Sequence, residues 1–189
     1  MDRKRTINIV LAVFLVAFAL FALISLGSFQ PTDPPFSNYP SNVQIKNYCG
    51  LLGAELSGYT LSGLGLASLA VILLLGAWGV IFLLKGEIED LWVKAVGGVL
   101  FVVSLSLFLG LLGPILPPKG LLAWSGGALG TTASNQLVKN LGLAGTGVFL
   151  AFGFFISTVL LFNISLAEGI VGWVRGLKAR SESKRPKKS

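Results

Sequence analysis

The sequence GLLGAELSGYTLSGLGLASLAVILLLG at residues 50–76 recurs in altered form 77 residues later, as GALGTTASNQLVKNLGLAGTGVFLAFG at residues 127–153. Eleven of the 27 aligned positions are identical without a gap, and the ordered frame G-x-x-G followed by L-G-L-A is kept. A repeated sequence usually means a repeated structure. We therefore expect two copies of a short glycine-marked segment, each leading directly into a long apolar run.

The composition predicts an integral membrane protein. The chain has 189 residues, of which 53% are hydrophobic and only 12% charged, whereas a soluble domain carries about 25% charged residues. Four long stretches hold no charged residue, and each is long enough for the roughly 20 residues that cross a bilayer as a helix. We expect an all-α fold whose four-helix membrane domain covers residues 1–168, with spans at about 6–27, 61–84, 93–116 and 143–166.

The first apolar run has a second interpretation, because a basic start followed by apolar residues is also typical of a signal peptide. The run covers about 20 residues, which exceeds the roughly 7–15 of a signal-peptide core. We therefore interpret residues 6–27 as the first transmembrane helix. Residues 28–49 follow with four prolines among polar residues, which cannot sustain a helix, and are expected to form an exposed loop.

The repeated segments themselves, about residues 50–63 and 127–141, are too short to cross the membrane. In the first, Leu52, Leu56 and Tyr59 recur at helical spacing. Short amphipathic helices of this kind lie at the membrane interface or tuck part-way into it. The alternative is an irregular loop.

The distribution of charge predicts the orientation. Of the 15 lysine and arginine residues, 12 lie at the two termini or in the 85–94 turn, and cytoplasmic segments carry an excess of these residues. Both termini are expected in the cytoplasm and both repeat segments outside, so that two helical hairpins form a parallel internal repeat. The basic residues of the termini, which we assign to topology and lipid contact, are Arg3, Lys4, Arg5, Arg175, Lys178, Arg180, Lys184, Arg185, Lys187 and Lys188.

The tail at residues 169–189 is expected to be the start of a disordered linker, since its basic, Ser- and Pro-containing composition cannot bury a core. Such a tail either binds anionic lipid or contacts nucleic acid through phosphates. Its basic residues, from Arg175 to Lys188, have no aromatic residues between them, so we favour lipid and expect no sequence-specific recognition of nucleic acid.

The sequence offers no catalytic constellation and no cofactor site. Histidine is absent and Cys49 is the sole cysteine, which excludes a Cys/His metal centre within the chain. No Gly-Lys dipeptide occurs, so the phosphate-binding loop of an ATPase is missing. Glu87, Glu89 and Asp90 lie beside two lysines, and we interpret them as a solvated turn.

Small residues at four-residue spacing are the main feature of the predicted spans. Helices in lipid associate by close backbone approach at such positions. Packing within one chain and self-association between chains are both open for these residues. The candidate packing positions are Ser106 with Gly110, Gly147 with Ala151, and Gly153 with Ser157.

At the repeat, the chain resembles the N-terminal four-helix membrane domain of the FtsK/SpoIIIE DNA translocases, over about residues 6–168. In the first copy the resemblance is carried by Asn47, Gly50, Gly53, Ala54, Leu56 and Gly65. In the second it is carried by Gly126, Gly127, Gly130, Leu137, Gly142 and Gly145.

The resemblance implies a membrane anchor in the bacterial inner membrane, located at the division septum, forming a homo-oligomer and contacting septal proteins. Members of the family continue through a linker into a hexameric motor that moves chromosomal DNA, and no residue here matches that motor. The chain is thus expected to be either a fragment or a stand-alone relative. The alternative functions are a stand-alone scaffold of the cell envelope and a small transporter or channel.

Overall fold

The computed structural model describes residues 3–34, 44–86, 90–113 and 125–162, and all regular structure within these ranges is helical. Four of the helices are long and apolar enough to cross a membrane, namely α1, α3, α4 and α5. The expected all-helical membrane fold with four spans is therefore confirmed. The helices are α1 (Arg3–Gly27), α2 (Gly50–Leu64), α3 (Ala67–Lys85), α4 (Leu91–Leu112) and α5 (Gly127–Phe162).

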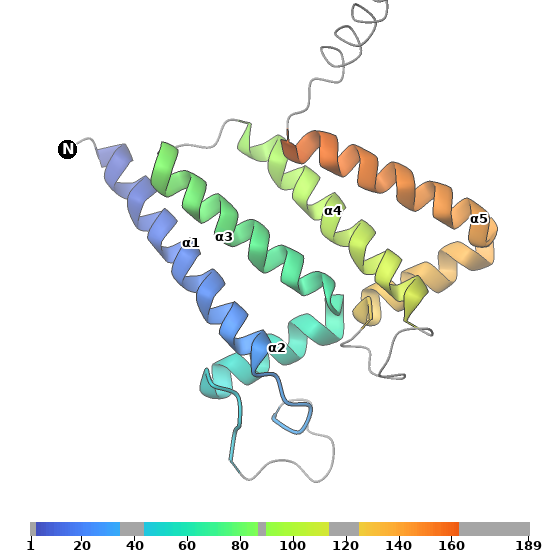
Figure 1. Ribbon diagram of the computed structural model, residues 1–189, viewed down its shortest axis with the longest axis horizontal. Helices are drawn as coiled ribbons and strands as arrows, with labels where there is room; N and C mark the ends of the chain where they lie inside the picture. Colours follow the sequence, from blue (N-terminus) through green and yellow to red (C-terminus); the bar gives the residue numbers. More distant parts are fainter. Residues whose placement is uncertain (1–2, 35–43, 87–89, 114–124, 163–189) are drawn as a thin grey trace, which may run out of the picture.

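The four long helices lie side by side in the order α1, α3, α4, α5, while α2 and the first part of α5 cross one end of them (Figure 1). The most extensive contacts join α4 to α5 and α1 to α3, whereas α3 and α4 touch less. The molecule thus consists of two helical pairs, each accompanied by a short crossing helix.

The apolar stretch expected to form the second span, residues 61–84, is divided between two helices. Leu61 lies in α2, and α3 begins only at Ala67. Gly65 ends α2 with φ 63° and ψ −144°, a conformation that is essentially restricted to glycine. The break falls inside a continuous apolar run, so hydropathy gives no sign of it.

In the second copy, the outer segment and the fourth span are two helical parts of α5 that meet at a kink at Gly142, where φ is 70° and ψ is 171°. Gly142 is the residue that matches Gly65 in the repeat, and the matched pair Gly50 and Gly127 also shares a positive φ of 64° and 65°. The ends expected at residues 114–116 and 163–166 lie outside the described residues, as does the tail at 169–189.

A hydroxyl group binds the backbone at each break. The Ser68 hydroxyl donates to the Gly65 carbonyl at 2.7 Å, and the Thr146 hydroxyl donates to the Gly142 carbonyl at 2.8 Å. Both side chains are buried. The Gly65 carbonyl also accepts from the Ser68 amide at 3.0 Å, so the Ser68 hydroxyl adds a second bond to this carbonyl.

The helices approach one another through small residues. Ala12, Ala19 and Ala22 are buried on α1, and a Cβ added at Gly76 of α3 would lie 3.3 Å from that of Ala19. Large apolar side chains face outward instead, including Phe14, Leu84 and Phe152. This distribution suits a protein surrounded by lipid, where close backbone approach drives helix association.

We predict that Gly65→Ala destabilises the protein more than Gly142→Ala does. The measurement is the midpoint of thermal unfolding in detergent, which should fall further in the Gly65 variant. Both changes force alanine into a glycine-only conformation, at about 1–3 kcal/mol. At Gly65 the new Cβ would also collide with the Ser125 carbonyl oxygen, whereas nothing lies within 4 Å at Gly142.

The control is Gly63→Ala, a helical position with no atom within 4 Å of the added Cβ, where alanine is expected to leave stability unchanged or to raise it. Equal midpoints for the Gly65 and Gly142 variants would contradict the close approach at Gly65.

Candidate functional site

The two repeat copies meet backbone to backbone at the end of the molecule where α2 and the first part of α5 lie (Figure 1). The Leu66 amide donates to the Ser125 carbonyl at 3.0 Å. A Cβ at Gly65 would collide with Ser125, and one at Gly127 would lie 2.5 Å from the Gly65 nitrogen. These two glycines are required because the main chains are too close for any side chain. We call this contact the glycine junction.

The same close approach continues between α4 and α5. The Ser106 hydroxyl donates to the Gly126 carbonyl at 2.7 Å. A Cβ at Gly130 would collide with the Ser106 carbonyl, and one at Gly110 would collide with the Gly130 carbonyl. The expected pair Ser106 and Gly110 therefore packs within the chain, against Gly126 and Gly130.

In the first copy, a buried polar network holds α2 against the end of α1. The Asn47 side-chain amide donates to the Ser25 carbonyl at 2.8 Å, and its oxygen accepts from the Cys49 amide at 3.0 Å. The Ser25 hydroxyl donates to the Gly53 carbonyl, and a Cβ at Gly53 would collide with Asn47. Asn47 and Gly53 thus act together, as two residues of one contact.

Asp33 joins the two ends of the loop that precedes α2. Its carboxylate accepts from the Asn47 amide at 2.9 Å and from the Lys46 amide at 3.2 Å. The side chain is only 3% exposed. Asp33 therefore fixes the chain after α1 beside the chain that enters α2, and so positions Asn47.

Sequence reasoning missed Asp33 and Ser25. Asp33 stands in a proline-rich stretch that reads as an exposed loop, and Ser25 is one hydroxyl in an apolar span. The sequence does hold a signal for the burial of Ser57 and Ser134, because they occupy the same position in the two repeat copies. Both are fully buried in the structure.

The remaining small residues divide into two groups. Gly153 faces the Ser104 hydroxyl oxygen, 2.6 Å from an added Cβ, and Ser157 is fully buried. Gly147 and Ala151, in contrast, are exposed, and no atom lies within 4 Å of a Cβ added at Gly147. Gly145 has only Leu141 of its own helix nearby.

Of the basic residues assigned to topology and lipid contact, the structure describes only those at the N-terminus. Arg3 and Lys4 begin α1, and Arg5 is exposed. The residues of the basic tail lie outside the described part of the chain, namely Arg175, Lys178, Arg180, Lys184, Arg185, Lys187 and Lys188.

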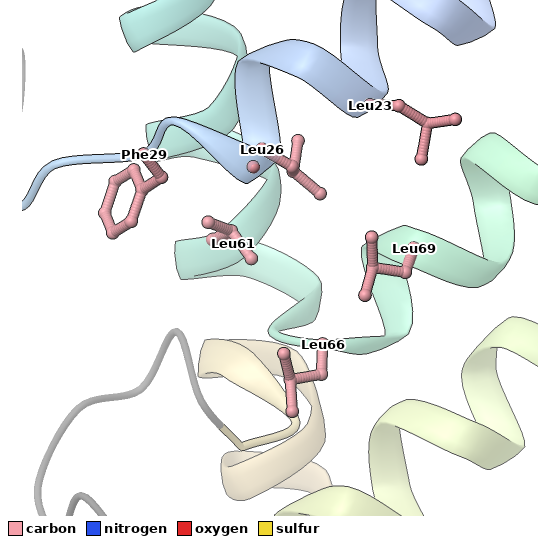
Figure 2. Close-up of a pocket in the computed structure, with 7 residues that line it drawn as sticks. Leu23, Leu26, Phe29, Leu61, Leu66 and Leu69 are labelled. Carbon is pink, nitrogen blue, oxygen red and sulfur yellow. The ribbon is translucent and has the colours of Figure 1, made fainter. Parts of the chain in front are cut away.

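An apolar cavity of about 250 Å³ lies beside the first crossing helix. Figure 2 shows leucines of α1, α2 and α3 around it, together with Phe29 and with Leu66 from the link between α2 and α3. No labelled side chain there carries a charge or a nucleophile, so this cavity supports no chemistry. Within the described ranges, no three His, Cys, Asp or Glu side chains come together as a metal site would require.

Four long apolar helices, packed through glycines and hydroxyls and surrounded by exposed apolar side chains, define a multi-pass helical membrane domain. Residues 4–174 match the family described as the 4TM region of DNA translocase FtsK/SpoIIIE, and the chain belongs to that family. No solved structure matches the chain. The protein is therefore a multi-pass inner membrane protein, and its family region is the membrane part of these translocases as distinct from the motor.

We predict that Asn47→Ala destabilises the protein by about 1–3 kcal/mol, the usual effect of leaving buried polar groups unpaired. The variant removes the donor to the Ser25 carbonyl and the acceptor of the Cys49 amide. Chemical denaturation in detergent measures the change. Asn135→Ala, at an exposed position of α5, is the matched control and should leave stability unchanged; an equal loss in both variants would contradict the network.

Proposed function

We propose that the chain anchors a DNA translocase in the inner membrane at the division septum and holds its copies together. The observation that carries this proposal is the family match over residues 4–174, which coincides with the region that holds the four spanning helices. The mechanism is positional: tethering motor subunits to one membrane site raises their effective concentration for assembly.

The orientation in this proposal places both termini in the cytoplasm. Its support is that the start of α1, the end of α3, the start of α4 and the end of α5 lie at one end of the bundle. The Asn8 side-chain amide at the start of α1 donates to the Gly86 carbonyl at 2.7 Å, and a Cβ at Gly97 near the start of α4 would lie 2.8 Å from that of Leu160 near the end of α5. Because cytoplasmic segments of membrane proteins carry an excess of basic residues, we assign that end to the cytoplasm.

The proposed oligomer contact is the exposed pair of Gly147 and Ala151 on α5. The other candidate pairs are covered by neighbouring helices of the same chain, whereas this one is open. Bulky side chains flank it, since Phe152 is 63% and Phe155 54% exposed. A groove of small residues between bulky ones admits a helix of a second copy to close backbone approach.

The proposed surface for septal proteins lies on the outer helices. Leu52 and Tyr59 of α2 are exposed on one helix face, and Leu129 of α5, the repeat partner of Leu52, is exposed as well. Leu52 and Tyr59 are seven residues apart, which is the spacing of side chains on one helix face that binds a partner helix.

A fluorescent fusion of residues 1–189 tests the anchoring proposal. We expect enrichment at the septum relative to the lateral membrane, and loss of that enrichment in Leu52→Asn/Tyr59→Asn with unchanged membrane content. Lys46→Gln, also exposed at the outer end, is the control and should keep the enrichment. An even distribution of the parent fusion around the cell would refute septal targeting by this domain.

We predict that Gly147→Ile/Ala151→Ile weakens self-association by about tenfold, equivalent to roughly 1.4 kcal/mol, because β-branched side chains block the close approach. The measurement is the dimerisation constant in detergent or lipid vesicles by energy transfer between labelled copies. Val148→Ile, on the same exposed stretch of α5, is the control. Unchanged association in the double variant excludes this pair as the contact.

A further inference from the structure

The glycine junction joins one glycine from each repeat copy, and the two glycines that match them in the repeat are left open. Gly65 of the first copy meets Gly127 of the second, and both are buried. Their matches are Gly142 and Gly50, which keep the same positive φ. No atom lies within 4 Å of a Cβ added at either of them. The chain therefore makes this contact once and carries the matching residues for a second contact of the same kind.

The residues beside the open glycines are exposed as well. In the glycine junction, the Leu66 amide donates to the carbonyl of buried Ser125. Leu143 follows Leu66 by 77 residues, and Tyr48 precedes Ser125 by the same interval. The side chain of Leu143 is 70% exposed and that of Tyr48 is 86% exposed. A second junction would join the Leu143 amide to the Tyr48 carbonyl.

The two open glycines lie at opposite edges of the molecule. Gly50 begins α2 beside the end of α1, whereas the kink of α5 at Gly142 lies at the far edge beyond α4 (Figure 1). Gly142 can therefore meet only the Gly50 of another copy. The two halves of such a contact differ, so the interface is heterologous, and repeating it gives a ring where the rotation closes and an open row where it does not.

The transmembrane part of α5 leaves open the face that α3 turns toward α4. A Cβ at Gly98 of α4 would lie 3.5 Å from Leu74 and Trp78 of α3. The residues 77 positions later are Ala151 and Phe155, and both are exposed. The helices α1 and α4 are each the first long helix of a pair. If the contact between the pairs is repeated between copies, α5 of one copy therefore faces α1 of the next.

We propose that copies of this chain associate head to tail, with Gly142 of one copy packed against Gly50 of the next in a second glycine junction. The Leu143 amide then donates to the Tyr48 carbonyl, and the exposed face of α5 lies along the next copy's α1, where Phe14 is 65% exposed. This inference rests on the proposed self-association and adds which two surfaces meet. Close backbone approach at the bare glycines supplies the attraction, as it does within the chain.

Cysteine cross-linking tests which surfaces meet. Tyr48→Cys/Leu143→Cys is prepared with Cys49 changed to Ala and reconstituted in lipid vesicles. The reagent is the shortest bifunctional maleimide that joins Leu66→Cys to Ser125→Cys within one chain, because that pair has the geometry of a junction. We expect a ladder of linked dimers, trimers and longer species, since each copy offers one cysteine to each neighbour.

The single variants distinguish a head-to-tail contact from a symmetric one. Tyr48→Cys and Leu143→Cys should each form no linked species alone, and a mixture of the two should give dimers and nothing longer. Linked dimers of either variant alone overturn the proposal, because a two-fold axis then brings identical residues together. The matched control is Tyr48→Cys/Leu129→Cys, also with two exposed sites, which should not link because Leu129 lies far along α5 from its kink.

Energy transfer between labelled copies of the same double variant separates this contact from self-association in general. Transfer without a ladder means that the copies associate through other surfaces, which overturns the head-to-tail contact and leaves the proposed self-association standing. Absence of both transfer and ladder overturns both.

Discussion

The structure depends on one constraint, which is that backbone polar groups at membrane depth must find partners within the protein. An unbroken helix meets it automatically. This chain breaks its helical path at Gly65 and Gly142, and at each break the glycine carbonyl accepts from a buried hydroxyl three or four residues later. The breaks let a short helix cross the end of each pair.

The same constraint accounts for what is buried. The largest fully buried side chains in the described ranges are serines and threonines such as Ser25, Ser134 and Thr146. Lipid is as apolar as leucine, so burying leucine gains little, whereas a hydroxyl or a bare glycine lets two backbones come together. The interior is therefore small and polar and the exterior large and apolar, the reverse of a soluble domain.

The sequence was sufficient to predict the four spans, because hydropathy over about 20 residues is a strong signal. It also predicted that Ser106 and Gly110 pack, since small residues at four-residue spacing stand out in an apolar run. It could not show that Gly147 and Ala151 are exposed while Ser106 and Gly110 are buried, because exposure depends on which helix packs against each position. Nor did it separate the first outer segment from the span that follows, because the expected ranges 50–63 and 61–84 overlap and Gly65 sits between leucines.

The bonds from Asp33 to the Lys46 and Asn47 amides have a consequence for how this region tolerates change. These bonds hold together the two ends of the loop between Asp33 and Lys46. The positions of α1 and α2 therefore do not depend on the residues within the loop. The entropic cost of closing a loop rises slowly with its length, by about 0.6 kcal/mol for each doubling of the number of residues. Residues 35–43 are therefore a natural place to insert an epitope or a labelling peptide while the helices keep their arrangement.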